Sequence, residues 1–315
     1  MPRAAVIRGS RAAELVEVPV PEPGAGEVRL RLEGSGVCGS DLAVWTGRPW
    51  FVYPRPPGAP GHEGWGVVDA LGAGAEGLLR EGDRVAGLSY NAYAEFDLAR
   101  AEDLVPLPEG VEHFPGEALG CAVNVVRRSG IEPGDTVALV GAGFLGCVIG
   151  QLAAGAGARV VAISRRRSAL ETARAMGAAE TVALDEPVVE RVEELTEGGL
   201  CDVVVEAAGA QATLDLAGPL TRTRGRLVIA GFHQDGSRSV DMQLWNWRGL
   251  DVVNAHERDP RVYVEGIREA ALAVSEGRLD PSPLYTHRFG LDELGRALET
   301  AVERPEGFMK ALVVP

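Results

Sequence analysis

The feature that most constrains the fold is a glycine-rich turn between an apolar run and a helix-forming run. Residues 136–140, TVALV, are followed directly by Gly141-Ala142-Gly143-Phe144-Leu145-Gly146, which matches the pattern G-x-G-x-x-G. The first glycine permits a tight turn, the second lets a pyrophosphate approach the backbone, and the third lets helix pack on strand. The helix N-terminus then offers free N–H groups and a positive dipole end to the phosphate. We therefore predict a dinucleotide site that includes Gly141, Gly143, Phe144, Leu145 and Gly146; a turn that serves packing alone is the alternative.

The second half of the chain repeats this alternation of apolar runs and helices. Further apolar runs occur at 158–164, 201–205, 225–230 and 250–255, and 167–178 has the pattern of a helix. Buried apolar strands that alternate with helices are typical of a parallel sheet covered on both faces. The predicted fold class is α/β, with a doubly wound, Rossmann-type cofactor domain over residues 125–261.

The first part of the chain has a different pattern of apolar residues. Residues 1–124 consist of short alternating runs broken by Gly and Pro, such as AGEVRLRLEGSGVC at 25–38, and they predict a β-rich domain. After the cofactor domain, 261–279 and 291–303 have amphipathic helical patterns, and 309–315 predicts a closing strand. We expect residues 262–315 to return to the first domain, which then comprises 1–124 and 262–315.

The end of the second predicted strand of the cofactor domain indicates which nicotinamide cofactor binds. An NAD site places Asp or Glu there for the ribose 2′-hydroxyl, but this chain has Ser164 followed by Arg165, Arg166 and Arg167. No carboxylate repels a 2′-phosphate, and guanidinium groups pair well with one. The pattern favours NADP over NAD, with Ser164 and Arg165 as contacts; a solvated basic loop is the alternative.

Charge and cysteine content exclude several classes of protein. The formal net charge of −14 argues against nucleic acid and anionic membranes as partners. The 4 cysteines are sparse and irregularly spaced, unlike a secreted disulfide framework. The first residues, MPRAAVIRGS, lack the apolar core of a signal peptide, and no apolar run is long enough to span a bilayer. We expect a cytoplasmic protein.

Three of the chain's metal-binding side chains make a candidate zinc site. Cys38 lies in GVCGSD, His62 in PGHEGWG, and Cys121 in LGCAV, just before the glycine turn. Two cysteines and one histidine form a recognised catalytic zinc set, with the fourth position left for water or substrate. Each cysteine has the alternative of being a small buried hydrophobic residue, and we assign that role to Cys147 and Cys201.

Taken in order, these motifs resemble the zinc-dependent alcohol dehydrogenases of the medium-chain dehydrogenase/reductase superfamily. The resemblance rests on GVCGSD, GHEGWGVVDALGAG, GDRVAG, LGCAV, GDTVALVGAGFLG and EAAG, which span nearly the whole chain. It implies a GroES-like catalytic domain, a Rossmann domain, hydride transfer between an alcohol and a nicotinamide, and a homodimer or homotetramer.

The resemblance also implies roles for single residues. Zinc is held by Cys38, His62 and Cys121, with Glu63 as a nearby carboxylate able to approach the metal. Asp41 orients His62, and Ser40 accepts the proton of the alcohol. The cofactor is also contacted by Ala208, Phe232 and Ala255.

Two positions depart from the family's pattern. No cysteine occurs in GDRVAGLSYNAYAEF, so the lobe that binds a second, structural zinc is absent and we predict one zinc. Ala43 replaces a histidine that passes the proton to solvent in many relatives. His233 or His256 is a candidate replacement for that histidine.

The substrate is expected to be polar. Two loops on the cofactor side are rich in polar groups, 232–235 (FHQD) and 254–257 (NAHE). Five further residues are predicted to line the opposite wall: Trp45, Arg48, Trp50, Ser89 and Tyr90. This lining favours a polyol, sugar derivative or cyclitol over a plain aliphatic alcohol. For His256 and Glu257, a surface ion pair or an interface contact is the alternative. A reductase of activated C=C bonds or quinones, and a non-enzymatic NADP-binding sensor, remain rival functions.

Overall fold

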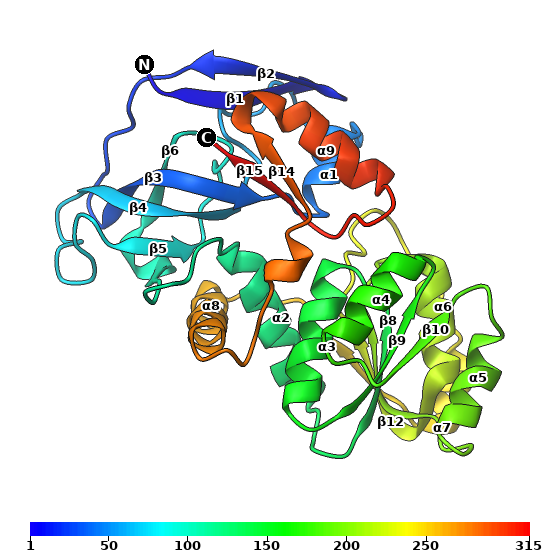
Figure 1. Cartoon of the computed structure of the whole chain (residues 1–315). Helices are drawn as coiled ribbons and strands as arrows, with labels where there is room; N and C mark the ends of the chain where they lie inside the picture. The colour runs from blue at the N-terminus through cyan, green and yellow to red at the C-terminus, as the bar shows by residue number, and fades with distance from the viewer. The chain divides into compact units, whose positions relative to one another are not determined.

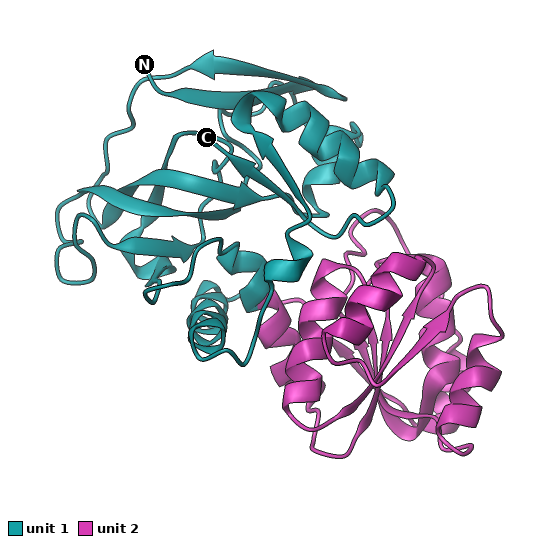
Figure 2. Cartoon of the chain, in the orientation of Figure 1, with its two compact units in different colours: residues 1–120, 259–315 teal, residues 121–258 magenta.

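The computed structural model describes all residues from 1 to 315 and divides into two compact units. Unit 1 comprises Met1–Gly120 and Asp259–Pro315, and unit 2 comprises Cys121–Arg258 (Figure 2). Each unit has its own sheet and its own core. The predicted α/β class, with a β-rich part and a Rossmann-type parallel-sheet part, is confirmed.

Unit 2 is built on a six-stranded sheet in the order β10-β9-β8-β11-β12-β13, and every neighbouring pair is parallel. Its strands are β8 (Thr136–Val140), β9 (Arg159–Ser164), β10 (Glu180–Ala183), β11 (Cys201–Glu206), β12 (Thr221–Ile229) and β13 (Asp251–Asn254). Its helices are α3 (Phe144–Gly155), α4 (Arg167–Ala175), α5 (Val188–Leu195), α6 (Gln211–Leu220) and α7 (Met242–Arg248) (Figure 1). The strand order reverses direction between β8 and β11, which is where open parallel sheets bind ligands at the carboxyl ends of their strands.

One predicted strand of unit 2 differs from expectation. Residues 250–255 were predicted as a buried strand, but β13 pairs only with β12, and Val252 is 40% exposed. An edge strand has no second neighbour to cover it, so its apolar side chains remain accessible. The prediction of a strand is confirmed, and the prediction of its burial is wrong.

Unit 1 contains a seven-stranded sheet that joins strands β3–β7 of the first part of the chain to two strands of its C-terminal part. Its path is β14-β15-β3-β4-β5-β7, β6 also pairs with β3, and β1 and β2 form a separate hairpin. The strands are β1 (Arg3–Gly9), β2 (Ala12–Glu17), β3 (Glu27–Gly36), β4 (Glu63–Leu71), β5 (Arg84–Gly87), β6 (Phe96–Arg100), β7 (Leu104–Pro106), β14 (His287–Gly290) and β15 (Ala311–Val314). The helices are α1 (Asp41–Trp45), α8 (Pro260–Ser275) and α9 (Leu294–Glu303), and α2 (Gly116–Ser129) begins in unit 1 and ends in unit 2.

The C-terminal strand of unit 1 pairs with a strand from the first part of the chain. This pairing brings together residues that are far apart in the sequence. Strand β15 pairs antiparallel with β3 through Leu312↔Gly36. Strand β3 pairs in turn with β4 through Gly36↔Glu63. Residues from both ends of the chain therefore lie around the same end of β3.

No helix of the structure combines the length and the apolar run that a membrane crossing needs.

Candidate active site

Unit 1 brings three potential metal ligands together at one end of its sheet. Cys38 lies in the turn after β3, His62 immediately precedes β4, and Glu63 is the first residue of β4. Ligand atoms of these three side chains lie within 4.8 Å of one another. The antiparallel register Gly36↔Glu63 explains the meeting, because it places the end of β3 beside the start of β4.

The imidazole of His62 has a fixed orientation. Its Nδ1 lies 2.8 Å from the carbonyl oxygen of Pro60 and 3.2 Å from Oδ1 of Asp41. Because Nδ1 carries the proton toward these acceptors, Nε2 is the nitrogen available to a metal. Nε2 also lies 3.4 Å from Oγ of Ser40.

Asp41 is the buried centre of this arrangement. It is 1% exposed, and its Oδ2 accepts hydrogen bonds from the backbone N–H of Cys38 at 2.9 Å and from the hydroxyl of Tyr93 at 2.6 Å. One carboxylate thus orients the imidazole of His62 and holds the turn that carries Cys38. Tyr93 was not among the sequence-predicted site residues.

The pKa values of these side chains are shifted because the groups are buried close to one another. Burial alone would lower the pKa of His62, but Asp41 and Cys38 outweigh it and raise the pKa well above its ordinary value. Burial, together with Asp41, raises the pKa of Tyr93, so this hydroxyl remains a hydrogen-bond donor. A cluster that draws protons in this way also attracts a divalent cation.

The donor set suits zinc. Thiolate, imidazole and carboxylate are its preferred ligands, and an imidazole whose other nitrogen faces a carboxylate is the usual arrangement around it. The separation of the three donors is compatible with ligands around a single tetrahedral ion.

The predicted ligand Cys121 lies outside this group of three. It is the first residue of unit 2, half-buried on helix α2. Glu117 precedes it by four residues on the same helix and therefore shares its face. Ligation by Cys121 stays a prediction, and Glu117 is a carboxylate that the sequence reasoning did not consider.

The sequence reasoning also missed Lys310. This side chain is 5% exposed, and its Nζ lies 2.7 Å from Oε1 and 2.5 Å from Oε2 of Glu63, which is 1% exposed. Burial lowers the pKa of Lys310, but Glu63, with Cys38 and Asp41, outweighs it and raises that pKa. A compositional signal was available, because Lys310 is the only lysine among the 31 basic Lys and Arg residues of the chain.

The glycine turn of unit 2 has the geometry that a phosphate cradle needs. Gly141 has φ +115°, and Gly146 packs so closely that an added Cβ would lie 2.0 Å from the carbonyl oxygen of Gly141. Gly143, the cap of α3, has no atom within 4 Å of an added Cβ. The protein's own packing requires the first and third glycines, whereas the space above the second is open to a ligand.

The predicted cofactor contacts at the end of β9 and the arginines beside them differ in burial and in pairing. Ser164 is buried, and its Oγ accepts from the backbone N–H of Arg166 at 3.3 Å. Arg167 is paired with Asp185 at 2.9 Å. Arg165 is exposed.

Two loops at the carboxyl end of the same sheet are locked together by a buried carboxylate, Glu206. Its Oε1 accepts from the backbone N–H groups of Ala208 and Gly209, at 2.9 and 2.8 Å, and from Thr213 at 2.7 Å. Its Oε2 lies 2.7 Å from Nε2 of His233. Ala208 and Phe232 are thereby held in fixed loops after β11 and β12, while Ala255 is buried directly after β13.

Several predicted substrate-wall residues have other surroundings. Trp45 is 4% exposed within the core of unit 1 and donates its indole N–H to Glu299 at 2.9 Å. Ser89 is also buried, whereas Trp50 and Tyr90 are 52% and 66% exposed. The prediction that Trp45 lines a substrate wall is therefore wrong, because the helix α1 that carries it packs on α9.

Glu257 also has a cationic neighbour within unit 2. Arg128 lies 4.0 Å from Glu257 and donates to the backbone carbonyl of His256 at 3.2 Å. Arg128 is therefore an ion-pair partner of Glu257.

Similarity to known proteins agrees with this geometry. Residues 24–172 match the family described as "Alcohol dehydrogenase GroES-like domain", and residues 145–271 match "Zinc-binding dehydrogenase". Sorbitol dehydrogenase of Gallus gallus is 30% identical over 96% of this chain and 94% of its own length. The chain belongs to the zinc-type alcohol dehydrogenase family. The resemblance drawn from its motifs is confirmed, and the protein is an NAD(P)-dependent dehydrogenase of the alcohol dehydrogenase type.

A second relative and a solved structure are also similar to this chain over nearly its whole length. The 2-dehydro-3-deoxy-L-galactonate 5-dehydrogenase of Pseudoalteromonas atlantica is 28% identical over 97% of this chain and 96% of its own length. A structure described as a zinc-binding dehydrogenase from Sinorhizobium meliloti 1021, bound to NADP, has a TM-score of 0.88 and 26% identity, and covers 100% of this chain and 99% of its own.

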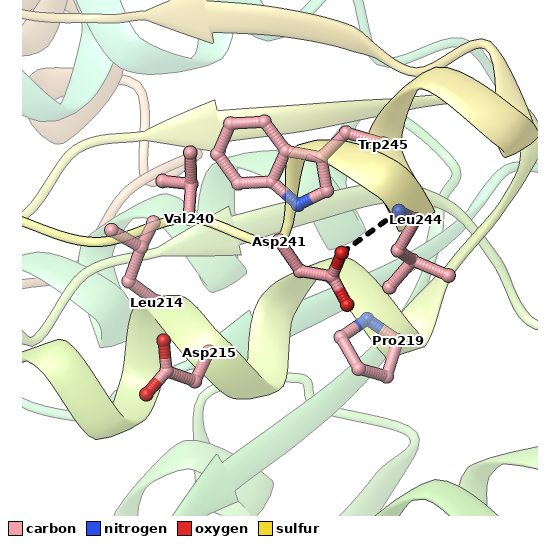
Figure 3. Close-up of a pocket in the computed structure, with 7 residues that line it drawn as sticks. All are labelled: Leu214, Asp215, Pro219, Val240, Asp241, Leu244 and Trp245. Carbon is pink, nitrogen blue, oxygen red and sulfur yellow. Dashed lines mark hydrogen bonds between the residues drawn. The ribbon is translucent and has the colours of Figure 1, made fainter.

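Unit 2 also contains a hollow whose lining includes none of the predicted site residues. It has a volume of about 200 Å³ and lies between α6 and α7 (Figure 3). It is lined by Leu214, Asp215, Pro219, Val240, Asp241, Leu244 and Trp245. Asp241 already accepts from the backbone N–H of Leu244 at 2.9 Å and so caps α7.

Proposed function

We propose that this enzyme transfers a hydride between NADP(H) and a polar, hydroxylated alcohol or the corresponding ketone. The observation that carries the proposal is the group Cys38, His62 and Glu63, held by buried Asp41 in a chain that also contains the glycine cradle at 141–146. A sensor that only binds NADP has no need of this ligand set.

The reaction divides between the metal and the chain's own groups. A zinc ion bound here supplies Lewis-acid chemistry that lowers the pKa of an alcohol. Cys38 and His62 hold the metal, with Cys121 as the proposed third ligand. Asp41 keeps the proton on Nδ1 of His62 and so leaves Nε2 for coordination. Ser40, whose Oγ lies 3.4 Å from Nε2, takes the proton of the alcohol.

NADP is the proposed cofactor because Ser164 and Arg165 stand where an NAD site has a carboxylate. Arg167 is neutralised by Asp185, so Arg165 is the guanidinium that we assign to the 2′-phosphate. The NADP bound to the Sinorhizobium meliloti relative supports this choice.

A polyol, sugar acid or related compound is the proposed substrate class. Two relatives that cover nearly the whole chain are named for sorbitol and for 2-dehydro-3-deoxy-L-galactonate, both rich in hydroxyl groups. Activated C=C bonds and quinones are the competing substrate class, and a turnover screen against both classes separates them.

We also propose that the enzyme is a cytoplasmic homo-oligomer that associates through its cofactor-binding unit. The open edge of β13 and the 88% exposed Trp247 on α7 are the features of unit 2 that support association. Light scattering on the purified protein measures the assembly state, and a monomer at micromolar concentration contradicts this part of the proposal.

The central experiment combines metal analysis with turnover. The purified protein should contain about one zinc per chain. Cys38→Ser and His62→Ala should lose both the zinc and the activity while NADP binding persists. Cys147→Ala is the matched control, because Cys147 is buried in mid-helix and should be dispensable for zinc. Full activity of Cys38→Ser or His62→Ala, or a zinc-free active protein, overturns the proposal.

Two more variants test the third ligand. Cys121→Ser should weaken zinc retention if its thiolate binds the metal. Glu117→Gln, one helical turn earlier, shows whether a carboxylate from the same face takes that role instead.

A further inference from the structure

The only lysine of the protein is buried beside the candidate metal ligands. The other 30 of the 31 basic Lys and Arg residues are arginines, and many of them lie in exposed ion pairs. Arginine presents a broad planar fork, whereas lysine presents a compact ammonium ion on a thin stem. The one lysine thus lies where a compact ammonium ion fits a closed space against a buried carboxylate.

Strand pairing delivers Lys310 to this position. It directly precedes β15, which pairs with the end of β3, and β3 pairs there with β4 at Glu63. Gly36, at the end of β3, makes the room. A Cβ added to Gly36 would lie 1.9 Å from Oε2 of Glu63 and 3.0 Å from Cε of Lys310. The ion pair thus occupies the volume that any other residue at position 36 would fill.

The ammonium ion contacts both oxygens of the carboxylate, at 2.7 and 2.5 Å. The same carboxylate lies within 4.8 Å of the ligand atoms of Cys38 and His62. Lys310 and a metal ion therefore compete for one anionic group. A buried carboxylate that loses its cationic partner is strongly driven toward another cation.

We propose that Lys310 is a positioning residue that holds Glu63 back from the zinc ion and so keeps one coordination position open for substrate. This inference rests on the proposed zinc-dependent function and adds to it a residue that sets how many protein ligands the metal has. Neutral replacement of Lys310 releases Glu63 toward the metal. The zinc is then held more tightly, and the position needed by the alcohol is blocked.

The proposal predicts that loss of Lys310 tightens zinc binding while it lowers turnover. In Lys310→Met, the release of zinc to a chelator should be slowed by about tenfold or more, and turnover should fall by about ten- to 100-fold. A purely structural role for Lys310 would instead make the zinc leave faster as activity fell. Cobalt substitution gives a third readout, since the visible absorption of Co²⁺ changes when a carboxylate joins the coordination sphere.

Three further variants complete the test. Lys310→Gln removes the charge but keeps a hydrogen-bond donor, and it replaces Lys310→Met if that variant does not fold. Lys310→Met combined with Glu63→Gln should release zinc at the rate of Glu63→Gln alone, because the effect acts through Glu63. Arg288→Met removes an exposed cation of the same unit and should leave zinc release unchanged.

The outcomes separate the two proposals. A wild-type protein that binds no zinc sinks the proposed function, whatever Lys310 does. Zinc-dependent wild-type turnover, combined with unchanged or faster zinc release from both Lys310 variants, overturns the positioning role alone. Slower release that persists in the double variant also overturns it, because the effect would then be simple charge repulsion.

Discussion

Two buried glutamates, one in each unit, have opposite surroundings. Glu206, at the end of β11, is 0% exposed and accepts from two backbone N–H groups, from Thr213 and from His233. Glu63, at the start of β4, is 1% exposed and is held by the ammonium ion of Lys310. The first carboxylate is satisfied by donors of its own loops, and the second by one distant cation.

This difference separates a structural carboxylate from a chemical one. Backbone donors cannot leave, so Glu206 fixes the loops at the edge where the cofactor is proposed to bind. Glu63 depends instead on a single ammonium ion, so removal of that ion would free the carboxylate to approach a metal. The cysteines divide in a similar way, since Cys38 is only half-buried in the ligand cluster while Cys147 and Cys201 are buried in unit 2.

The largest expected effect concerns these thiols. Burial raises the pKa values of Cys147 and Cys201 to about 12. At pH 8 their thiolate fraction, and hence their alkylation rate, should be about 1000-fold below that of an ordinary thiol. Peptide mass spectrometry after iodoacetamide treatment of the metal-free protein should find Cys38 labelled and these two unlabelled.

Zinc sharpens this labelling test. Added zinc should protect Cys38, and protection of Cys121 in the same experiment would identify it as a further ligand. Early labelling of Cys147 or Cys201 in the folded protein would contradict the assignment of both as inert core residues.

The next effect concerns the stability of the cofactor edge. Glu206→Gln turns an amide N–H₂ group toward donors that need an acceptor, and it should lower the free energy of unfolding by about 3 kcal/mol. Urea unfolding measures this loss, with exposed Glu193→Gln as the control that should change little. A Glu206→Gln variant as stable as this control would mean that the hydrogen bonds of Glu206 contribute nothing net.

A smaller effect is expected on the choice of cofactor. Arg165→Ser should raise the Kd for NADP about tenfold, which corresponds to about 1.4 kcal/mol, and leave that for NAD unchanged. Arg167→Ser is the matched control, because Arg167 is already paired with Asp185. Equal losses of affinity for NADP and NAD in Arg165→Ser would contradict the assignment of Arg165 to the 2′-phosphate. A loss of NADP affinity in Arg167→Ser alone would contradict it as well.

The smallest effect is expected from His233, a candidate for the missing proton relay at Ala43. Nδ1 of His233 accepts from Nε of Arg238 at 2.9 Å, so Nε2 carries the proton and donates it to Glu206. With both nitrogens engaged, His233 is not free to pass protons. His233→Gln should cost about 1 kcal/mol of stability and leave the pH–rate profile unmoved, whereas Ser40→Ala should alter it. A shifted profile in His233→Gln would restore the relay role.

Much of the fold was predictable because its signals are local. The apolar run at 136–140, the glycine turn and the following helix are encoded by adjacent residues, and they appear as β8, the cradle and α3. The short strand β10 and helices α5 and α7 were not predicted. Helix α7 spans only seven residues and none of them is fully buried, so its apolar pattern is too short for a periodicity argument.

The candidate site was predictable in part for the same reason. Cys38, Ser40 and Asp41 lie in one turn, and His62 and Glu63 are adjacent, so motifs along the chain identify them. The burial of β13 was predicted wrongly, because a sequence does not state whether a further strand covers an edge. Trp45 was placed on a substrate wall because its burial against α9 depends on residues far along the chain.

The sequence by itself determined the family, the glycine cradle and most residues of the proposed metal site, since each depends on neighbouring positions. Only the tertiary structure decided that Lys310 neutralises Glu63, across a separation of 247 residues. The physical reason is that a buried charge must find its partner through space, and strand pairing between the two ends of the chain provides that partner.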